Sequence, residues 1–146
     1  MLTMTVRQIL ARKGPEIIST TPETSVLDAL ALMAERNIGA LLVLSDGEPV
    51  GMFTERDYAR KIILRGKASK DTPVSAVMTS RVLGVGPDQT VEECMAIMTD
   101  KRIRHLPVSE DGKLLGMISI GDVVRSLIDE QRFVIQQLEN YITGAR

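Results

Sequence analysis

The sequence predicts an α+β fold in which two pseudo-symmetric β-α-β-β-α repeats pack face to face. Three observations support this fold: the chain duplicates itself, each copy carries a serine or threonine at the same two helix-capping positions, and each contains the same Asp-Gly hairpin turn. A unit of this size buries too little apolar surface to be stable alone, so two related copies are expected to cover each other. A short lead-in helix precedes the repeats, and an extended helix ends the chain.

The duplication is visible when the sequence is shifted by 65 residues. Residues 17–63 then align with 82–128 without a gap, and 14 of the 47 pairs are identical. The identities fall at turn and cap positions as well as at apolar ones, for example Asp46 with Asp111 and Asp57 with Asp122. A shared fold alone would not conserve such positions without a gap, so the repeat records a duplication.

Helix caps and tight turns divide each copy into elements. Ser25 and Thr90 are favourable N-caps, and Thr90 with Glu93 forms a capping-box pattern ahead of apolar residues at helical spacing. Asp46-Gly47 and Asp111-Gly112 predict two-residue hairpin turns. A second helix is expected to begin at Thr54 or Ser119. The expected strands are 17–20, 40–44 and 50–53 in the first copy, and 82–85, 105–108 and 115–118 in the second.

Helical segments flank the repeats. Apolar residues at 6–10 and 74–78 predict a core-facing lead-in to each copy, the second opened by Thr72 as N-cap and Pro73. In chain order this places the first domain at 1–66 and the second at 67–146. The last helix is expected to run to about Tyr141 with an apolar stripe that has no counterpart in the first copy. Either it packs back on its own domain or, as we prefer, it forms a homodimer contact.

Composition excludes several functions. The 146 residues include 44% hydrophobic and 25% charged residues with a net charge of −1, so no basic field attracts nucleic acid or an anionic membrane. No apolar run approaches the ~20 residues of a membrane span, and no secretory signal is present, so a cytoplasmic location is expected. The single cysteine, Cys94, is expected to be a buried inert thiol. His105 is the only histidine, and no metal site is expected around it.

Two heptads carry a resemblance to a known family. Gly51-Met-Phe-Thr-Glu-Arg-Asp57 and Gly116-Met-Ile-Ser-Ile-Gly-Asp122 resemble the G-h-x-[ST]-x-x-D signature of CBS domains. One such heptad is weak evidence, but two in register within a duplicated unit are specific. The resemblance covers nearly the whole chain and is closest to stand-alone CBS-pair proteins of bacteria and plant organelles.

The heptad chemistry allows two interpretations. Thr54 and Ser119 can be simple N-caps, with Asp57 and Asp122 completing capping boxes. Alternatively, the same helix N-terminus binds a phosphate, the hydroxyl adds a hydrogen bond and the aspartate accepts both ribose hydroxyls. The glycine that opens the heptad would let a ligand approach the backbone, and capping alone does not require it. We therefore favour nucleotide binding.

The resemblance implies two ligand sites in the cleft between the repeats, each combining the Ser/Thr and Asp of one repeat with strand residues of the other. One site joins Ser119 and Asp122 to Thr20, Gly39 and Ala40, and the second joins Thr54 and Asp57 to Val85, Arg104, His105 and Pro107. Arg56, Arg104 and His105 are the candidate phosphate partners, although solvated charge explains each arginine equally well, and His105 could simply pack beside Pro107. Small Gly39 and Ala40 correspond to Arg104 and His105, so the two sites are expected to differ.

The resemblance further implies a regulatory module that senses AMP, with ATP, ADP, NAD and S-adenosylmethionine as alternatives, and signals to an unknown protein partner. No catalytic arrangement, P-loop or Gly-x-Gly-x-x-Gly motif is found, so we expect no enzyme activity and no catalytic cofactor. The alternative is a dimeric scaffold that binds no ligand.

Overall fold

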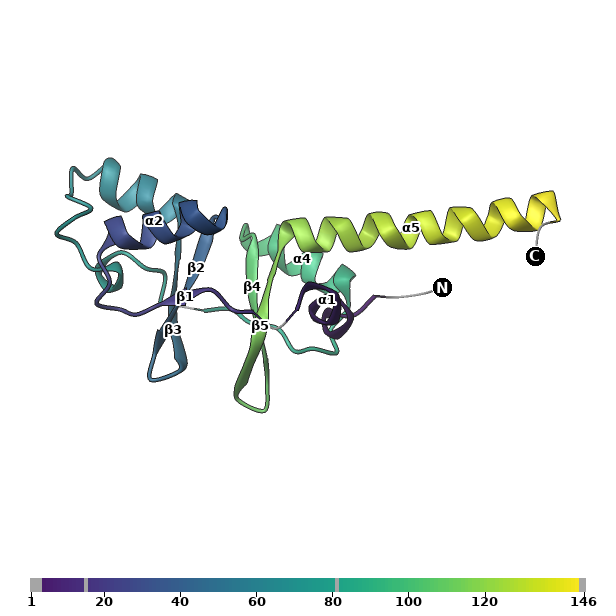
Figure 1. Cartoon of the computed structure of the whole chain (residues 1–146), viewed down its shortest axis with the longest axis horizontal. Helices are drawn as coiled ribbons and strands as arrows, with labels where there is room; N and C mark the ends of the chain where they lie inside the picture. Colours follow the sequence, from purple (N-terminus) through teal and green to yellow (C-terminus); the bar gives the residue numbers. More distant parts are fainter. Residues whose placement is uncertain (1–3, 15, 81, 145–146) are drawn as a thin grey trace. The chain divides into compact units, whose positions relative to one another are not determined.

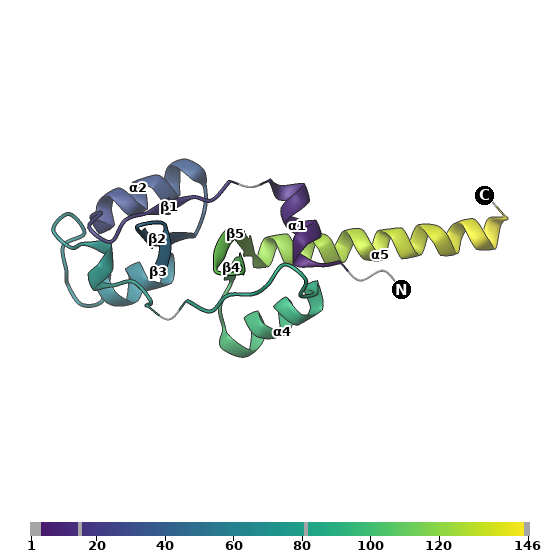
Figure 2. The same cartoon turned by 90° about the horizontal axis from the view of Figure 1, so that it is seen from below.

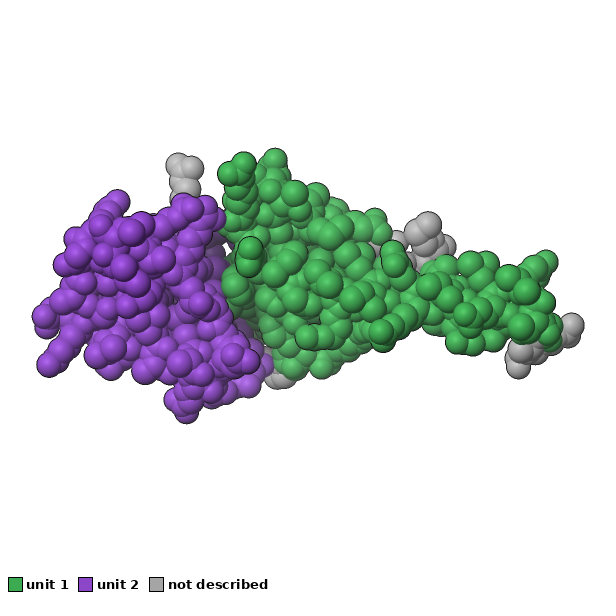
Figure 3. Space-filling view, turned by 90° about the horizontal axis from the view of Figure 1, so that it is seen from above, with its two compact units in different colours: residues 1–15, 84–146 green, residues 16–83 purple. Residues whose placement is uncertain are grey.

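The computed structural model describes residues 4–14, 16–80 and 82–144, and it is a mixed α+β structure with two small sheets, as the sequence predicts (Figure 1). The chain divides into two compact units, coloured separately in Figure 3. Unit 2 comprises 16–83, and unit 1 comprises 1–15 together with 84–146.

Unit 2 contains the first repeat. Its sheet has the order β1-β2-β3, with β1 (Ser19–Thr20) parallel to β2 (Ala40–Ser45) and β2 antiparallel to β3 (Glu48–Thr54). Helix α2 (Val26–Arg36) begins at the predicted cap Ser25, and α3 (Glu55–Asp57) continues into the π-helix η1 (Tyr58–Ile63). The core includes Leu41, Val43 and Phe53.

Unit 1 contains the second repeat and the lead-in helix α1 (Val6–Lys13). Strands β4 (His105–Glu110) and β5 (Lys113–Ser119) form a hairpin. The hairpin contacts three helices, α1, α4 (Val91–Lys101) and α5 (Ile120–Thr143) (Figure 2). The predicted strand at 82–85 is reduced to one parallel bridge between Val85 and Val108. In both hairpins the Asp-Gly pair has positive φ at both residues, as the predicted turn requires.

The lead-in segments pack against the other repeat's core. Val6 and Ile9 of α1 are buried among second-repeat residues such as Val91 and Ile118. Correspondingly, η2 (Val74–Ala76) with Val77 packs into the core of the first repeat, and Thr79 bridges Met52 of β3. Chain order therefore gives repeats at 1–66 and 67–146, whereas compactness assigns each lead-in to the opposite repeat.

One cap prediction was wrong. Thr72 does not cap the second lead-in, because its hydroxyl donates to the Ala68 carbonyl at 2.7 Å, and the short 3₁₀-helix begins after Pro73 without a side-chain cap. Thr72 instead closes the turn that precedes the lead-in.

Helix α5 is longer than the repeat needs. Leu127 packs against the core of unit 1, but from Ile128 onward the apolar side chains are exposed, and the end of the helix projects beyond the rest of its unit (Figures 1 and 2). The helix therefore does not pack back along its C-terminal half. Within the described residues, no helix combines the length and apolar character needed to cross a bilayer.

Candidate functional site

The two heptads place their hydroxyl and carboxylate side chains at helix starts, directly after the second strand of each hairpin. Thr54 ends β3 and caps α3, and Ser119 ends β5 and caps α5. Both form full capping boxes, because the aspartate three residues on accepts a hydrogen bond from the backbone N–H of the cap residue. The predicted capping role is therefore confirmed in both repeats.

In unit 2, four donors surround the Asp57 carboxylate. Oδ2 accepts from the Thr54 N–H at 3.0 Å and from the Thr54 hydroxyl at 3.1 Å. Oδ1 accepts from the Thr79 hydroxyl at 3.2 Å and pairs with Lys61 Nζ at 3.1 Å. Lys61 also donates to the Val77 carbonyl at 2.9 Å. The buried carboxylate therefore ties the second lead-in to the start of α3.

In unit 1, the Asp122 carboxylate faces Lys13, the last residue of α1. Asp122 Oδ2 accepts from the Ser119 N–H at 2.8 Å and from Lys13 Nζ at 2.9 Å. Lys13 also donates to the Met117 carbonyl at 2.7 Å. Arg125 Nη1 lies 3.8 Å from the other carboxylate oxygen, Oδ1. Burial raises the pKa of Asp122, but the bonds from Lys13 and Ser119 outweigh burial and leave it below its ordinary value.

Four partners of these carboxylates were not predicted as site residues: Lys13, Lys61, Thr79 and Arg125. Lys61 follows Asp57 by four residues, a spacing that favours ion pairs on a helix. Thr79 and Lys13 lie 22 and 109 residues from their aspartates, so only tertiary packing brings them there.

The signature glycines accommodate lead-in side chains. A Cβ on Gly116 would lie 2.8 Å from Leu10 Cδ2, and a Cβ on Gly51 would clash with the side chain of Met78. Packing of the lead-in therefore gives both glycines a structural reason that does not involve a ligand.

The remaining predicted site residues fall into two sets, one in each unit. In unit 2, Ala40 is the register partner of Thr54, and the Gly39 carbonyl accepts the Glu55 N–H at 3.1 Å. Thr20 lies in the adjoining β1, where its hydroxyl donates to Thr24 at 2.8 Å, and Arg56 lies in α3. The hairpin start and the helix cap therefore meet at one end of the sheet.

Unit 1 repeats the arrangement. His105 is the register partner of Ser119, and the Arg104 carbonyl accepts the Ile120 N–H at 2.8 Å. Val85 donates its N–H to the Pro107 carbonyl at 3.0 Å. The exposed Arg104 and the half-buried His105 thus lie at the same end of the hairpin as Asp122. This end of unit 1 gathers cations around one carboxylate.

His105, the only histidine, is expected to make the stability of unit 1 fall at acidic pH. Burial, then the charges of Lys13 and Arg104, lower the pKa of His105 against the opposing effect of Asp122. In the unfolded chain, His105 binds its proton at a higher pH than in the folded protein. The contribution of the neutral His105 side chain to stability is therefore complete above pH 6.5, and it is lost as the pH falls from 6.5 through the lowered pKa of the folded protein. Denaturant unfolding should therefore give a lower free energy at about pH 5.5 than at about pH 7.5. His105→Gln should flatten this difference, and an unchanged difference in the variant would contradict the assignment.

Two other features carry no chemistry of their own. Burial, and secondarily Glu93, raises the pKa of the Cys94 thiol to about 11, which agrees with the predicted inert thiol. Among the described residues, no group of His, Cys, Asp or Glu side chains could hold a metal ion.

The comparisons agree with the heptads. The model of the CBS domain matches residues 6–64 and 74–129. A mitochondrial CBS-domain protein of Arabidopsis thaliana, CBSX3, is 42% identical over 96% of this chain and 72% of its own length. A solved protein with CBS domains from Burkholderia ambifaria is 50% identical, with a TM-score of 0.85 over 88% of this chain and 96% of its own. The CBS pair of MJ0100, solved with 5′-methylthioadenosine and S-adenosyl-L-methionine, shares the fold with a TM-score of 0.78 at 23% identity, over 88% of this chain and 99% of its own.

Proposed function

The chain belongs to the CBS-domain family and carries two copies of the domain, and from this premise we propose that it is a non-catalytic regulatory module that binds an adenine nucleotide at its heptads. The observation that carries the proposal is the pair of largely buried carboxylates, Asp57 and Asp122, each held at a helix start beside a hydroxyl. Ordinary capping boxes can lie at the surface, as that of Thr90 and Glu93 does.

Under this proposal, the aspartates bind the ribose of the ligand and a second group of side chains binds its phosphate. The aspartate accepts hydrogen bonds from the two ribose hydroxyls, since an ionised carboxylate offers acceptor sites only. Arg56 and Arg104 supply positive charge and donors to the phosphate, and His105 supplies a hydrogen-bond donor. The proposed contacts to the sugar and base are Thr20, Gly39 and Ala40 in unit 2, and Val85 and Pro107 in unit 1. Binding then stabilises one of two states of the module, and a protein partner recognises that state.

AMP is the proposed ligand, and ATP, ADP, NAD and S-adenosylmethionine are its competitors. The cations near Asp122 favour a ligand that carries phosphate. The adenosine-type ligands of MJ0100 support the proposal to the extent that the same fold holds them in that protein.

A ligand panel tests the proposal. Nucleotide-free protein is titrated calorimetrically with each of the five compounds, and its melting temperature is measured with each. At 100 times the Kd, one bound ligand adds about 2.7 kcal/mol of stability, which corresponds to a rise in melting temperature of roughly 5 °C or more. If none of the compounds releases heat or shifts melting, the sensor function is wrong.

A specific observation favours a second candidate, a dimeric scaffold without ligand. Every signature residue already has a structural partner: Leu10 and Met78 cover the glycines, and Lys13 and Lys61 pair with the aspartates. Under this alternative the heptads serve folding alone, and the ligand panel would be negative.

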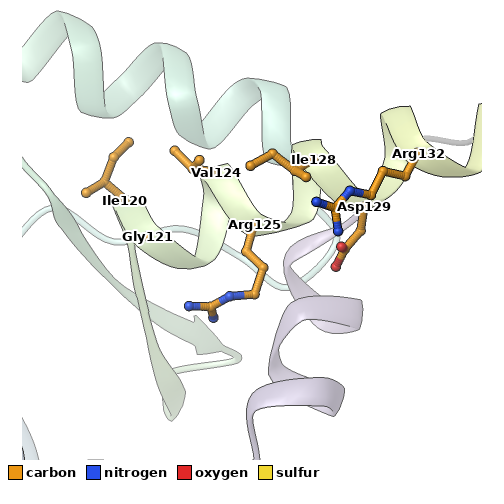
Figure 4. Close-up of a pocket in the computed structure, with 7 residues that line it drawn as sticks. All are labelled: Ile120, Gly121, Val124, Arg125, Ile128, Asp129 and Arg132. Carbon is orange, nitrogen blue, oxygen red and sulfur yellow. The ribbon is translucent and has the colours of Figure 1, made fainter.

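We also propose that the chain forms a homodimer through the exposed apolar stripe of α5. The groove in Figure 4 begins this stripe: Val124 and Ile128 lie on one side of α5, and Arg125 extends from the other. Further along, Ile135, Leu138 and Ile142 are more than half exposed. A helix end with these side chains in water would be marginal alone, and a second copy would cover them.

Light scattering after size exclusion tests the dimer. Wild-type protein should have twice the mass of the chain, and Leu138→Lys should reduce it to the monomer because a charge enters the apolar contact. Gln137→Lys, at the neighbouring polar position, is the matched control and should remain dimeric. A monomeric wild type, or a dimeric Leu138→Lys variant, would contradict this contact.

A further inference from the structure

The lysine at the end of α1 occupies the carboxylate that the proposed ligand needs. Lys13 Nζ lies 2.9 Å from Asp122 Oδ2, and the Ser119 N–H donates to the same oxygen at 2.8 Å. A carboxylate oxygen offers about two acceptor positions, so Oδ2 has none left. A sugar diol that engages both oxygens of Asp122 must therefore displace Lys13.

Lys13 also lies where its displacement would affect the end of α1. It is the last residue of α1, and the chain passes into unit 2 after residue 15. The upstream part of the helix is held firmly, since Val6 and Ile9 are buried and the Arg7 N–H donates to the Pro87 carbonyl at 2.8 Å. At the end of the helix, Lys13 bridges two partners, the Asp122 carboxylate and the Met117 carbonyl. Loss of this bridge would therefore act first on the last turn of α1.

The first repeat has a related contact, made by the second lead-in, which packs into its core. There, Thr79 donates to Asp57 Oδ1, while the lysine on that carboxylate, Lys61, comes from the same short helical segment as Asp57 itself. In both units, the lead-in that precedes the other repeat in chain order reaches the signature aspartate. In unit 1 alone, among the described residues, the lead-in supplies a cation.

We propose that Lys13 is an internal competitor for the sugar of the ligand at Asp122, and that its release couples ligand binding to the last turn of α1. The proposal rests on the proposed function and names the residue that regulates that site. It identifies the ligand group involved as a vicinal diol. The phosphate is a separate matter, because a released Lys13 could still be attracted to it.

Adenosine is therefore the probe, since it carries the diol without phosphate. Its affinity is measured by calorimetry for wild type, Lys13→Gln, Lys13→Arg and Arg12→Gln. Arg12 is the matched control, because it precedes Lys13 on α1 and pairs with Asp129 of α5, at 2.7 Å, rather than with Asp122. Its substitution removes the same charge and one ion pair between α1 and α5.

Lys13→Gln should tighten adenosine binding by about two- to fivefold, the range expected for loss of a partly exposed ion pair. Lys13→Arg, which keeps the cation, and Arg12→Gln should both bind like wild type. Adenosine binding by Lys13→Gln alone, with none by wild type, would support the proposal more strongly. Equal or weaker binding by Lys13→Gln would overturn it while the proposed function stands. Failure of all four proteins to bind adenosine would overturn this proposal, and the titration with AMP would then show whether the proposed function fails as well.

Hydrogen exchange gives a second measurement that does not depend on a variant. The Gly14 N–H donates to the Leu10 carbonyl at 2.9 Å and closes the last turn of α1. Saturating adenosine should speed exchange of this amide in wild type, whereas most ligands slow exchange where they bind. Slower or unchanged exchange at Gly14 in the saturated protein would show that Lys13 stays in place, and would overturn the coupling.

Discussion

Replacing Ile9 with alanine is expected to destabilise unit 1 by about 2–5 kcal/mol, the cost of removing a buried isoleucine side chain from a packed core. Ile9 is 3% exposed and belongs to the cluster formed by Val91, Cys94, Leu106 and Ile118. Chain order alone would assign this residue to the first repeat. Because Ile9 packs in the core of the second repeat, we expect the loss of stability there.

Residue-resolved hydrogen exchange under native conditions measures where the stability is lost. In Ile9→Ala, protection should fall in α4, β4, β5 and the first half of α5. The control is Val77→Ala, which removes a residue 2% exposed in the core of unit 2 and should reduce protection in α2, β2 and β3. If Ile9→Ala lowered protection in α2 and β3 instead, the exchange of lead-ins would be wrong.

Local chemistry explains what the sequence could predict. The Asp-Gly turns, the Ser25 cap and the capping boxes of Thr90, Thr54 and Ser119 depend on residues within three or four positions of one another. Such contacts do not depend on packing against distant parts of the chain. Because the sequence is duplicated, the turns and the caps could each be recognised in both repeats. The β-α-β-β-α order and the family could therefore be predicted from the residues alone.

Non-local packing explains what the sequence could not predict. Nothing near Val6 or Ile9 indicates which core they enter, because an apolar helix face fits either repeat. The same holds for Lys13, whose charge could as well be solvated, and for Leu10, whose contact gives Gly116 a purely structural reason. The π-helical continuation of α3 likewise has no marker in residues 58–63.

Alanine at Asp122 is expected to weaken binding of the adenine ligand by about 100-fold or more. A hydrogen bond to a charged group contributes about 1.5–3 kcal/mol, and the proposed ribose contact comprises two of them. The variant also loses a helix-capping contact and the partner of Lys13. A fall in stability alone would therefore not distinguish a ligand site from a cap.

Glu93 provides the control for that ambiguity. Its carboxylate accepts from the Thr90 N–H at 3.1 Å in a capping box of the same geometry, but outside the heptads. Glu93→Ala should lose capping as Asp122→Ala does, and should keep wild-type affinity for the ligand. Thermal melting of each variant without ligand shows that both are folded at the temperature of the titration.

Calorimetric titration of AMP into wild type, Asp57→Ala, Asp122→Ala and Glu93→Ala decides whether the heptads bind the nucleotide. Wild type and Glu93→Ala should bind alike, and at least one heptad variant, Asp122→Ala first, should lose the ligand. If AMP binds all four proteins equally, the heptads do not hold the nucleotide. If AMP binds none of them, and the other adenine compounds also fail, the aspartates are helix caps and the chain is a scaffold.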